Sequence, residues 1–382
     1  MKKIKLDHLG QYYAAISGVE SPGTFAVQAC LAEDLDGYVL YKAVQDIVGR
    51  LPHFNVRQHN GFMHYYNQLL DEDVDLEWEE ENTQPCRYFP EGDRLFRVVC
   101  GRRHFRLEVL HSVCDGRSLA YVACSLLIRY FELMGVSVNK KGFIDCDGKG
   151  CTEEAEDAYA RHADMRKTEY EKPMDVYVPK YKPASAQFIT HKFDLEKLKA
   201  GASAQEFTIS EHIMEFIFGA LDRQRQIDGC NKPITINVPI DCRGFFSSKS
   251  LRNFVTHKIV DSPACLRGVT EGYVQGKISE MERWIRFGGI VPLFIKKPII
   301  RSVGNSATAG CSTAFSNLGL LKLPAEIACK VLDFAFMLGA EKMPYQFACV
   351  TFGNVLNLTA TVTVQNTEIL DKIVNDLNNA PL

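Results

Sequence analysis

The sequence of 382 residues lacks the short motifs on which several large enzyme classes depend. It contains no GxSxG, no HExxH and no GxGxxG, and the stretch from Gly142 to Lys149 has the wrong spacing for a P-loop. These absences argue against nucleotide hydrolysis and zinc proteolysis. His53, His59 and His64 lie close together, but neither their spacing nor their neighbours are those of metal ligands. We therefore expect no metal site.

Long apolar runs are missing as well. A helix that crosses a bilayer needs about 18 or more consecutive apolar residues, and no stretch of the chain offers them. The most apolar late segment, from Leu323 to Gly339, is interrupted by Glu326, Lys330 and Asp333. An excess of basic residues is also absent, since the formal net charge is −3. We expect neither a membrane span nor a nucleic-acid surface.

Cysteine is abundant but is not arranged for disulfides. The 13 cysteines are scattered, odd in number and include no CxxC pair, which is typical of reduced thiols in the cytosol. The basic N-terminus resembles the start of a signal peptide, but Asp7, His8 and Gln11 interrupt any apolar segment after it. We expect a cytoplasmic protein.

The first part of the chain alternates helical and strand patterns. Apolar residues recur at helical spacing in 35–48 and again in 117–134, where the helix ends at Gly135. Between them, 95–100 and 105–110 predict a β-hairpin. The acidic run from Asp71 to Glu81 has two interpretations, a docking patch for a basic partner or a solvated edge strand protected by charge.

The composition changes in the middle of the chain. After residue 136 it becomes rich in Gly, Lys and Asp, and a charged helical stretch (152–171) precedes an extended run with three prolines. We interpret 173–187 as a linker between an N-terminal lobe, 1–172, and a C-terminal lobe, 188–382. In the second lobe, Thr208 and Glu211 form a capping-box pattern ahead of a helix over 210–226. Strands are expected at 188–193, 234–240, 254–260, 314–321 and, folded at Gly353, 347–364. The fold class is therefore α/β, with a mixed sheet flanked by helices in each lobe.

The residues with the clearest chemical pattern are 111–116, HSVCDG. His111 follows the predicted strand 105–110, and Asp115 and Gly116 come directly before a helix, so the turn aims an imidazole out of the edge of a sheet. Gly116 permits the close or left-handed backbone that this turn needs. An ordinary capped helix start with a partly buried histidine is the alternative. A second HxxxD, at His257 and Asp261, lies inside a predicted strand without a turn glycine, and we take it as a chance match.

HSVCDG resembles the HxxxDG motif of the acyltransferase superfamily that contains chloramphenicol acetyltransferases, condensation domains of nonribosomal peptide synthesis, BAHD acyltransferases and microbial alcohol acetyltransferases. The resemblance extends over nearly the whole chain. RLPHF (50–54) is similar to the entry motif of the first lobe, and PIDCR (239–243) with LRNF (251–254) is similar to the D-x-R…N signature of the second. AFSNLG (314–319) looks like the S-N-x-G strand of the alcohol acetyltransferase branch.

Two departures narrow the resemblance. Leu110 precedes His111, so the double histidine usual in condensation domains is missing, and no DFGWG of the plant-type branch occurs. With no carrier or adenylation segment in the sequence, the resemblance favours a standalone enzyme that uses acyl-CoA. It implies two lobes with a tunnel between them, compatible with a monomer or a trimer. No tightly bound cofactor is expected, and the partners are a small-molecule acceptor and a thioester donor.

The resemblance also implies roles for individual residues. His111 would act as general base on an alcohol or amine, and Asp115 would form a structural ion pair with Arg243. Ser316, Asn317 and Asn253 are the candidates for contacts to the oxyanion or the substrate. Lys249, Arg252 and Lys258 are candidates for the CoA phosphates.

Three alternatives remain open. A nucleophilic Cys114 paired with His111 would form a covalent acyl intermediate, although the superfamily gives that position no role. A non-catalytic member of the superfamily would use the tunnel for binding only. A third possibility keeps catalysis but takes the donor from an acyl carrier protein, for which Arg102, Arg103, Lys249 and Arg252 would have to form a basic surface.

Overall fold

A computed structural model describes residues 2–81, 83–162, 174–266 and 291–380 of the chain. The elements of the first part, in order, are β1 (Lys3–Lys5), α1 (His8–Ile16), β2 (Thr24–Leu31), α2 (Gly37–Arg50), η1 (Pro52–Phe54), β3 (Val56–Asn60), β4 (Tyr65–Leu69), β5 (Leu76–Trp78), β6 (Phe96–Cys100), β7 (His104–Leu110), α3 (Gly116–Leu133), η2 (Thr152–Ala155) and α4 (Ala158–His162). Those of the second part are β8 (Pro183–Asp194), α5 (Leu195–Ala204), α6 (Ile209–Ile227), β9 (Ile236–Asp241), η3 (Cys242–Gly244), β10 (Val255–Val260), α9 (Leu293–Ala309), β11 (Thr313–Leu321), α10 (Ala325–Ala328), β12 (Val331–Leu338), β13 (Tyr345–Phe352), β14 (Val355–Val364) and α11 (Glu368–Asn379).

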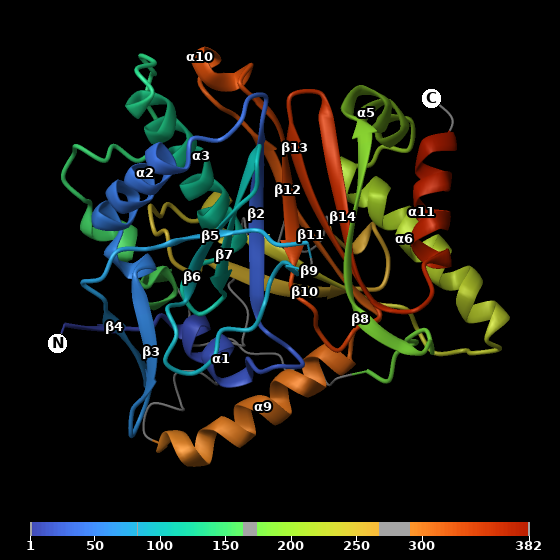
Figure 1. Cartoon of the computed structure of the whole chain (residues 1–382). Helices are drawn as coiled ribbons and strands as arrows, with labels where there is room; N and C mark the ends of the chain where they lie inside the picture. Colours follow the sequence, from blue (N-terminus) through green and yellow to red (C-terminus); the bar gives the residue numbers. More distant parts are fainter. Residues whose placement is uncertain (1, 82, 163–173, 267–290, 381–382) are drawn as a thin grey trace.

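Two sheets form the centres of two lobes (Figure 1). The first lobe holds a five-stranded sheet in the order β12-β2-β7-β6-β5, and the second holds a six-stranded sheet in the order β10-β9-β11-β13-β14-β8. A small sheet, β1-β4-β3, lies beside the first lobe. Helices α2 and α3 cover the first sheet, and α5, α6 and α11 cover the second. The expected two-lobed α/β fold is confirmed. Among the described residues, no helix combines the length and apolarity that crossing a membrane requires.

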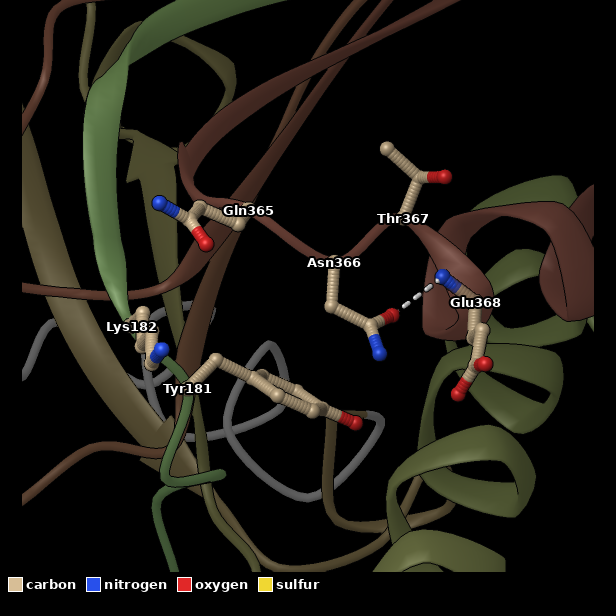
Figure 2. A pocket seen from close by; sticks show the side chains of 6 residues that line it. All are labelled: Tyr181, Lys182, Gln365, Asn366, Thr367 and Glu368. Carbon is tan, nitrogen blue, oxygen red and sulfur yellow. Dashed lines mark hydrogen bonds between the residues drawn. The ribbon is translucent and has the colours of Figure 1, made fainter.

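The second lobe is built as its sequence pattern predicts. Helix α6 begins at the capping box of Thr208 and Glu211, and its buried face, including Ile213 and Ile217, packs on the six-stranded sheet. A surface hollow of about 430 Å³ lies where β14 turns into α11, lined by Tyr181, Lys182, Gln365, Asn366, Thr367 and Glu368 (Figure 2). This hollow contains none of the residues that the sequence selects for chemistry.

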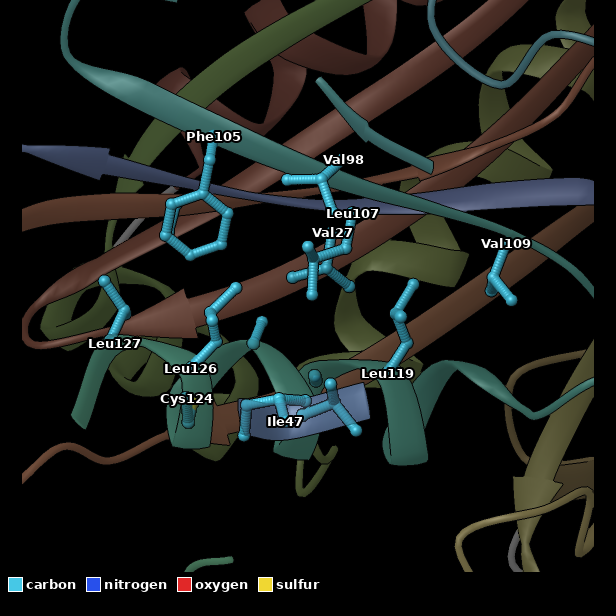
Figure 3. Close-up of a cluster of buried hydrophobic side chains, with 14 of the residues drawn as sticks. Val27, Ile47, Val98, Phe105, Leu107, Val109, Leu119, Cys124, Leu126 and Leu127 are labelled. Atoms are coloured by element: carbon cyan, nitrogen blue, oxygen red, sulfur yellow. The ribbon is translucent and has the colours of Figure 1, made fainter. Parts of the chain in front are cut away.

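The core of the first lobe lies between its sheet and helices α2 and α3 (Figure 3). Alternate residues of β7, Phe105, Leu107 and Val109, point toward Leu119 and Leu126 of α3. The hairpin β6–β7 and the helix that follows it agree with the sequence prediction. Within the acidic run, Leu76–Trp78 form the edge strand β5, which supports the second of the two interpretations offered for the run.

The boundary between the lobes needs two corrections. Strand β12, within the predicted C-terminal lobe 188–382, crosses over and pairs with β2 of the first sheet, with Leu338 opposite Phe25. Strand β8 starts at Pro183, so it takes in the end of the predicted linker 173–187, whose first residue lies outside the described part of the chain. Of the helical stretch predicted over 152–171, the described residues form η2 and α4. Residues of the predicted C-terminal lobe thus form one edge of the first sheet.

Gly339 marks the place where β12 leaves the first sheet. Its N–H donates to the Thr24 carbonyl oxygen at 2.8 Å, and a Cβ at Gly339 would lie 2.2 Å from that oxygen. Backbone must shift to accept a side chain here, so we expect Gly339→Ala to lower the free energy of unfolding by about 1–3 kcal/mol. Denaturant titration measures the loss.

Gly49→Ala is the matched control. Gly49 is exposed within α2, and a Cβ there meets nothing within 4 Å, so helix propensity predicts a gain of about 0.5–1 kcal/mol. Equal unfolding free energies for the two variants would contradict the constraint at the crossover.

Candidate active site

The HSVCDG turn lies where β7 ends and α3 begins, as the sequence predicts. The His111 N–H donates to the Gly23 carbonyl oxygen at 2.8 Å, which fixes the turn to the start of β2. Gly116 opens α3 without a left-handed backbone, and that part of the expectation is wrong. Glycine is favoured at position 116 for a steric reason, because a Cβ there would lie 3.1 Å from side-chain atoms of both Leu318 and Phe336.

The His111 ring is enclosed by aromatic side chains. Tyr13 of α1 stacks on it with ring centroids 3.8 Å apart and planes inclined by 11°. Phe25 of β2 lies on it at a tilt, with centroids 4.8 Å apart. Burial lowers the pKa of His111 from its ordinary value, although the nearby Asp115 charge opposes the shift. The imidazole is therefore neutral at pH 7.

Asn253 decides which ring nitrogen carries the proton. Its Nδ2 donates to the His111 carbonyl oxygen at 3.0 Å and to both carboxylate oxygens of Asp7 at 3.3 Å. Its Oδ1, an acceptor only, therefore lies 3.0 Å from His111 Nδ1. The Nδ1 atom must donate this hydrogen bond, so the lone pair of the neutral ring is on Nε2. Asn253 was expected to contact substrate, and the structure makes it the residue that orients His111.

Asp115 and Arg243 form the ion pair that the sequence leads us to expect. Arg243 Nη1 donates to Asp115 Oδ2 at 2.9 Å across the two lobes. The N–H groups of Phe254, at 2.8 Å, and Ser118, at 2.9 Å, also donate to the Asp115 carboxylate. Burial by itself would raise the pKa of Asp115, but the Arg243 charge and these N–H donors bring it below its usual value. Asp115 is thus a fixed anion that caps α3.

The two predicted contact residues on β11, Ser316 and Asn317, have different outcomes. Ser316 pairs with Ala348, which belongs to the first-lobe core, whereas Asn317 pairs with Cys349 of the second-lobe core. Paired residues share a face of the sheet, so the two side chains point in opposite directions. Asn317 Nδ2 donates to Ser210 Oγ at 3.0 Å, at the start of α6. Asn317 therefore faces away from the first lobe, and only Ser316 stays a candidate for the oxyanion.

Of the three basic residues predicted to bind the CoA phosphates, one is excluded and two remain predictions. Arg252 is only 7% exposed, and its guanidinium lies 2.8 Å from the Lys5 carbonyl oxygen and 3.4 Å from Asp7 Oδ2. Its expected role as an exposed phosphate contact is wrong, because the charge is used inside the protein. Lys249 is exposed and Lys258 is half-buried on β10, and both remain predictions.

His257, taken as a chance match from the sequence, belongs to the same cluster as His111. Its Nε2 lies 2.9 Å from the Tyr13 hydroxyl, whose ring stacks on His111. Burial, and to a smaller extent His111, lowers the pKa of His257 to about 4. Asp261 contacts Cys265 instead, so this HxxxD is not a second motif. In the sequence, the only indication that His257 belongs to the site was its position four residues after Asn253, itself a predicted site residue.

Cys114 has the properties of a core residue. Its side chain is fully buried, and burial together with the Asp115 charge raises the pKa of the thiol well above its ordinary value. A nucleophilic cysteine needs a thiolate. The covalent alternative therefore loses its support. The described residues contain no group of three or more side chains placed to hold a metal ion.

Comparison with known proteins shows the fold. No family model and no curated sequence matches the chain. Polyketide synthase associated protein 5 from Mycobacterium tuberculosis has a similar structure, with a TM-score of 0.66 at 13% identity over 98% of this chain and 96% of that one. The starter condensation domain of rhizomide synthetase, in a variant solved in complex with C8-CoA, gives a TM-score of 0.65 at 9% identity over 99% and 95%.

A third solved structure is the condensation domain of Monacolin K polyketide synthase, with a TM-score of 0.60 at 10% identity over 100% of this chain and 99% of that one. This chain has the two-lobed fold of condensation domains. Membership of the superfamily that HSVCDG suggests, and the closeness to alcohol acetyltransferases, stay predictions.

The ion pair between the lobes can be tested by stability. We expect Asp115→Ala to lower the free energy of unfolding by about 3–5 kcal/mol, because it removes the fully buried partner of Arg243 and leaves the buried N–H groups of Ser118 and Phe254 without their acceptor. Asp241→Ala is the control, since Asp241 lies at the same 2.9 Å from Arg243 but is 35% exposed and should cost at most about 1 kcal/mol. If both variants lost the same unfolding free energy in denaturant titrations, the Asp115–Arg243 pair would not be what holds the two lobes together.

Proposed function

We propose that this protein is an acyltransferase that moves an acyl group from a thioester donor to an alcohol or amine. The observation that carries the proposal is the His111 imidazole, neutral and with its Nδ1 proton held by Asn253, at the motif turn of a condensation-domain fold. An imidazole held in this way presents Nε2 as a base in a fixed direction.

The reaction needs few groups. His111 Nε2 takes the proton of the acceptor as the acceptor attacks the thioester carbonyl carbon, the carbon–sulfur bond breaks, and the imidazolium returns the proton to the departing thiolate. Proton transfer of this kind contributes about 10² to 10⁴ in rate. Asp115 takes no proton in this scheme, because its carboxylate is already bound by Arg243 and two N–H groups. Ser316 is our candidate donor to the oxyanion.

We propose that His111 lines a narrow channel between the lobes. The residue keeps part of its surface accessible to solvent, while burial is the largest influence on its pKa. A side chain that lines a narrow passage combines these two properties. We therefore place the reacting carbonyl beside His111, between the sheets of the two lobes.

Acyl-CoA is the donor that we propose. One structure with this fold is described in complex with C8-CoA. Lys249, which is exposed, and Lys258 remain the candidates for its phosphates, and contacts of that kind weaken with added salt. A donor attached to an acyl carrier protein is the alternative, and tight binding of such a protein without binding of acyl-CoA would favour it.

The central variant is His111→Asn. We expect it to reduce free-thiol release from acyl-CoA, in a screen against alcohols and amines, by about 10² to 10⁴ because it removes the base. His59→Asn, in which the replaced histidine contacts Gln68 on the small sheet, serves as control and should keep wild-type turnover. Wild-type turnover in His111→Asn would refute the assignment. Binding of acyl-CoA without any turnover in the wild type would indicate the non-catalytic alternative.

The pH profile provides a second test. Protonation of His111 removes the base, and burial places its pKa below the ordinary 6.5. With an alcohol acceptor, the midpoint of the acid limb of kcat/KM should therefore lie below pH 6.5. An acid limb with its midpoint above 6.5 would contradict a buried neutral imidazole as the base.

A further inference from the structure

A second ionisable group lies at the same edge of the first sheet as His111. Strand β2 runs antiparallel to both of its neighbours, β7 and β12. The end of β7, the start of β2 and the end of β12 therefore meet at one edge. His111 follows β7, Gly23 precedes β2, and Glu341 follows β12.

Gly23 connects His111 and Glu341. Its carbonyl oxygen accepts from the His111 N–H at 2.8 Å, and its own N–H donates to the Glu341 carboxyl group. Ser21 Oγ also donates to Glu341 Oε2. Because Gly23 has a φ of +61°, a conformation that favours glycine, the turn that holds both groups is well defined. One residue thus fixes the backbone of His111 on one side and the carboxyl of Glu341 on the other.

Among the described residues, Glu341 has neutral neighbours, and Lys342 is the one charged group that acts on it. Tyr12 and Tyr13 of α1 lie close enough to be influenced by its charge. Burial and, to a smaller extent, the Glu341 charge raise the pKa of both phenols, with Tyr12 contributing to the shift of Tyr13, so they stay neutral. Lys342 is next to it in the chain, but the Lys342 ammonium lies 3.4 Å from exposed Glu20. Burial raises the pKa of Glu341 to about 8, against the smaller influence of Gly23 and Lys342.

We propose that Glu341 is a second acid–base group of this site and that the acceptor is an amine, which binds to Glu341 as an ammonium ion. The proposal rests on the proposed acyl transfer and names its acceptor class. A carboxylate without a cationic partner is stabilised by an ammonium ion. The phenol oxygens of Tyr12 and Tyr13 offer acceptors for the other N–H donors of that ion.

The number of protons favours an amine over an alcohol. An alcohol loses one proton on acylation, which His111 alone can take. An ammonium ion loses two. The Glu341 carboxylate takes the first and leaves the neutral amine; the amine nitrogen attacks the thioester carbonyl carbon, His111 Nε2 takes the second proton, and the imidazolium passes it to the departing thiolate. Glu341 then releases its proton to solvent, so that amide, thiol and one proton are the products.

Calorimetry with a matched pair of probes tests the proposal. Wild type and Glu341→Gln are titrated at pH 7 with 1-hexylamine hydrochloride and with 1-hexanol, in buffers of different ionisation enthalpy. A carboxyl group with a pKa of about 8 is about nine-tenths protonated at pH 7, so hexylammonium should displace close to one proton on binding to the wild type. Glu341→Gln should bind hexylammonium at least about tenfold more weakly, without proton release, and should bind hexanol unchanged.

Glu20→Gln is the matched control. It makes the same chemical change beside Lys342, but at an exposed position, and should behave like wild type. Hexylammonium binding that is absent, that releases no proton, or that is equal in wild type and Glu341→Gln would overturn the proposal. If Glu341→Gln does not fold, Ser21→Ala replaces it: loss of the hydroxyl donor should raise the pKa of Glu341 and weaken hexylammonium binding, and unchanged binding would count against us.

This experiment separates the acceptor class from the reaction itself. Proton-linked binding of hexylammonium needs no acyl donor. If binding follows the expectation while no acyl-CoA is consumed with any acceptor, the acyl transfer is wrong and the cation site stands. If His111-dependent thiol release occurs with alcohols and hexylammonium does not bind at Glu341, the proposed acyl transfer stands and the assignment of the acceptor as an amine is wrong.

Discussion

The Asp115 carboxylate is held from both lobes at once, and the arrangement of the site depends on it. It caps α3 in the first lobe through Ser118, and it accepts from Arg243 and from the Phe254 N–H in the second. Arg243 in turn donates to the Arg252 carbonyl oxygen at 2.7 Å. The residues on both sides of Asn253 are therefore fixed by this one ion pair, and Asn253 sets the proton on His111. The contact between the lobes thereby determines which nitrogen of the imidazole is basic.

Local patterns were sufficient for most of the fold. The periodicity of 105–110 and 117–134, the capping box at Thr208 and the turn at Gly353 each depend on neighbours in sequence, and each predicted element formed. The crossover of β12 was not predictable in this way. Its apolar residues are typical of any buried strand, and the choice of β2 as partner is a matter of tertiary packing.

The site residues that belong to a sequence motif could be predicted. His111, Asp115 and Arg243 come together as the resemblance implied, whereas Asn317 and Arg252 do not serve as expected. The side chains that complete the cluster come from the N-cap of α1 (Asp7), from α1 itself (Tyr13), from β10 (His257) and from the loop after β12 (Glu341). No spacing in the sequence links these segments, because only the antiparallel pairing of strands and the packing of α1 bring them to His111.

The tautomer of His111 is the most direct test of this account. NMR of the protein labelled with ¹⁵N-histidine, with the signal assigned by comparison with His111→Asn, reports which ring nitrogen carries the proton. We expect a neutral His111 at pH 7, protonated on Nδ1 and with an unprotonated Nε2. A proton on Nε2 of the neutral ring, or an imidazolium at that pH, would contradict it.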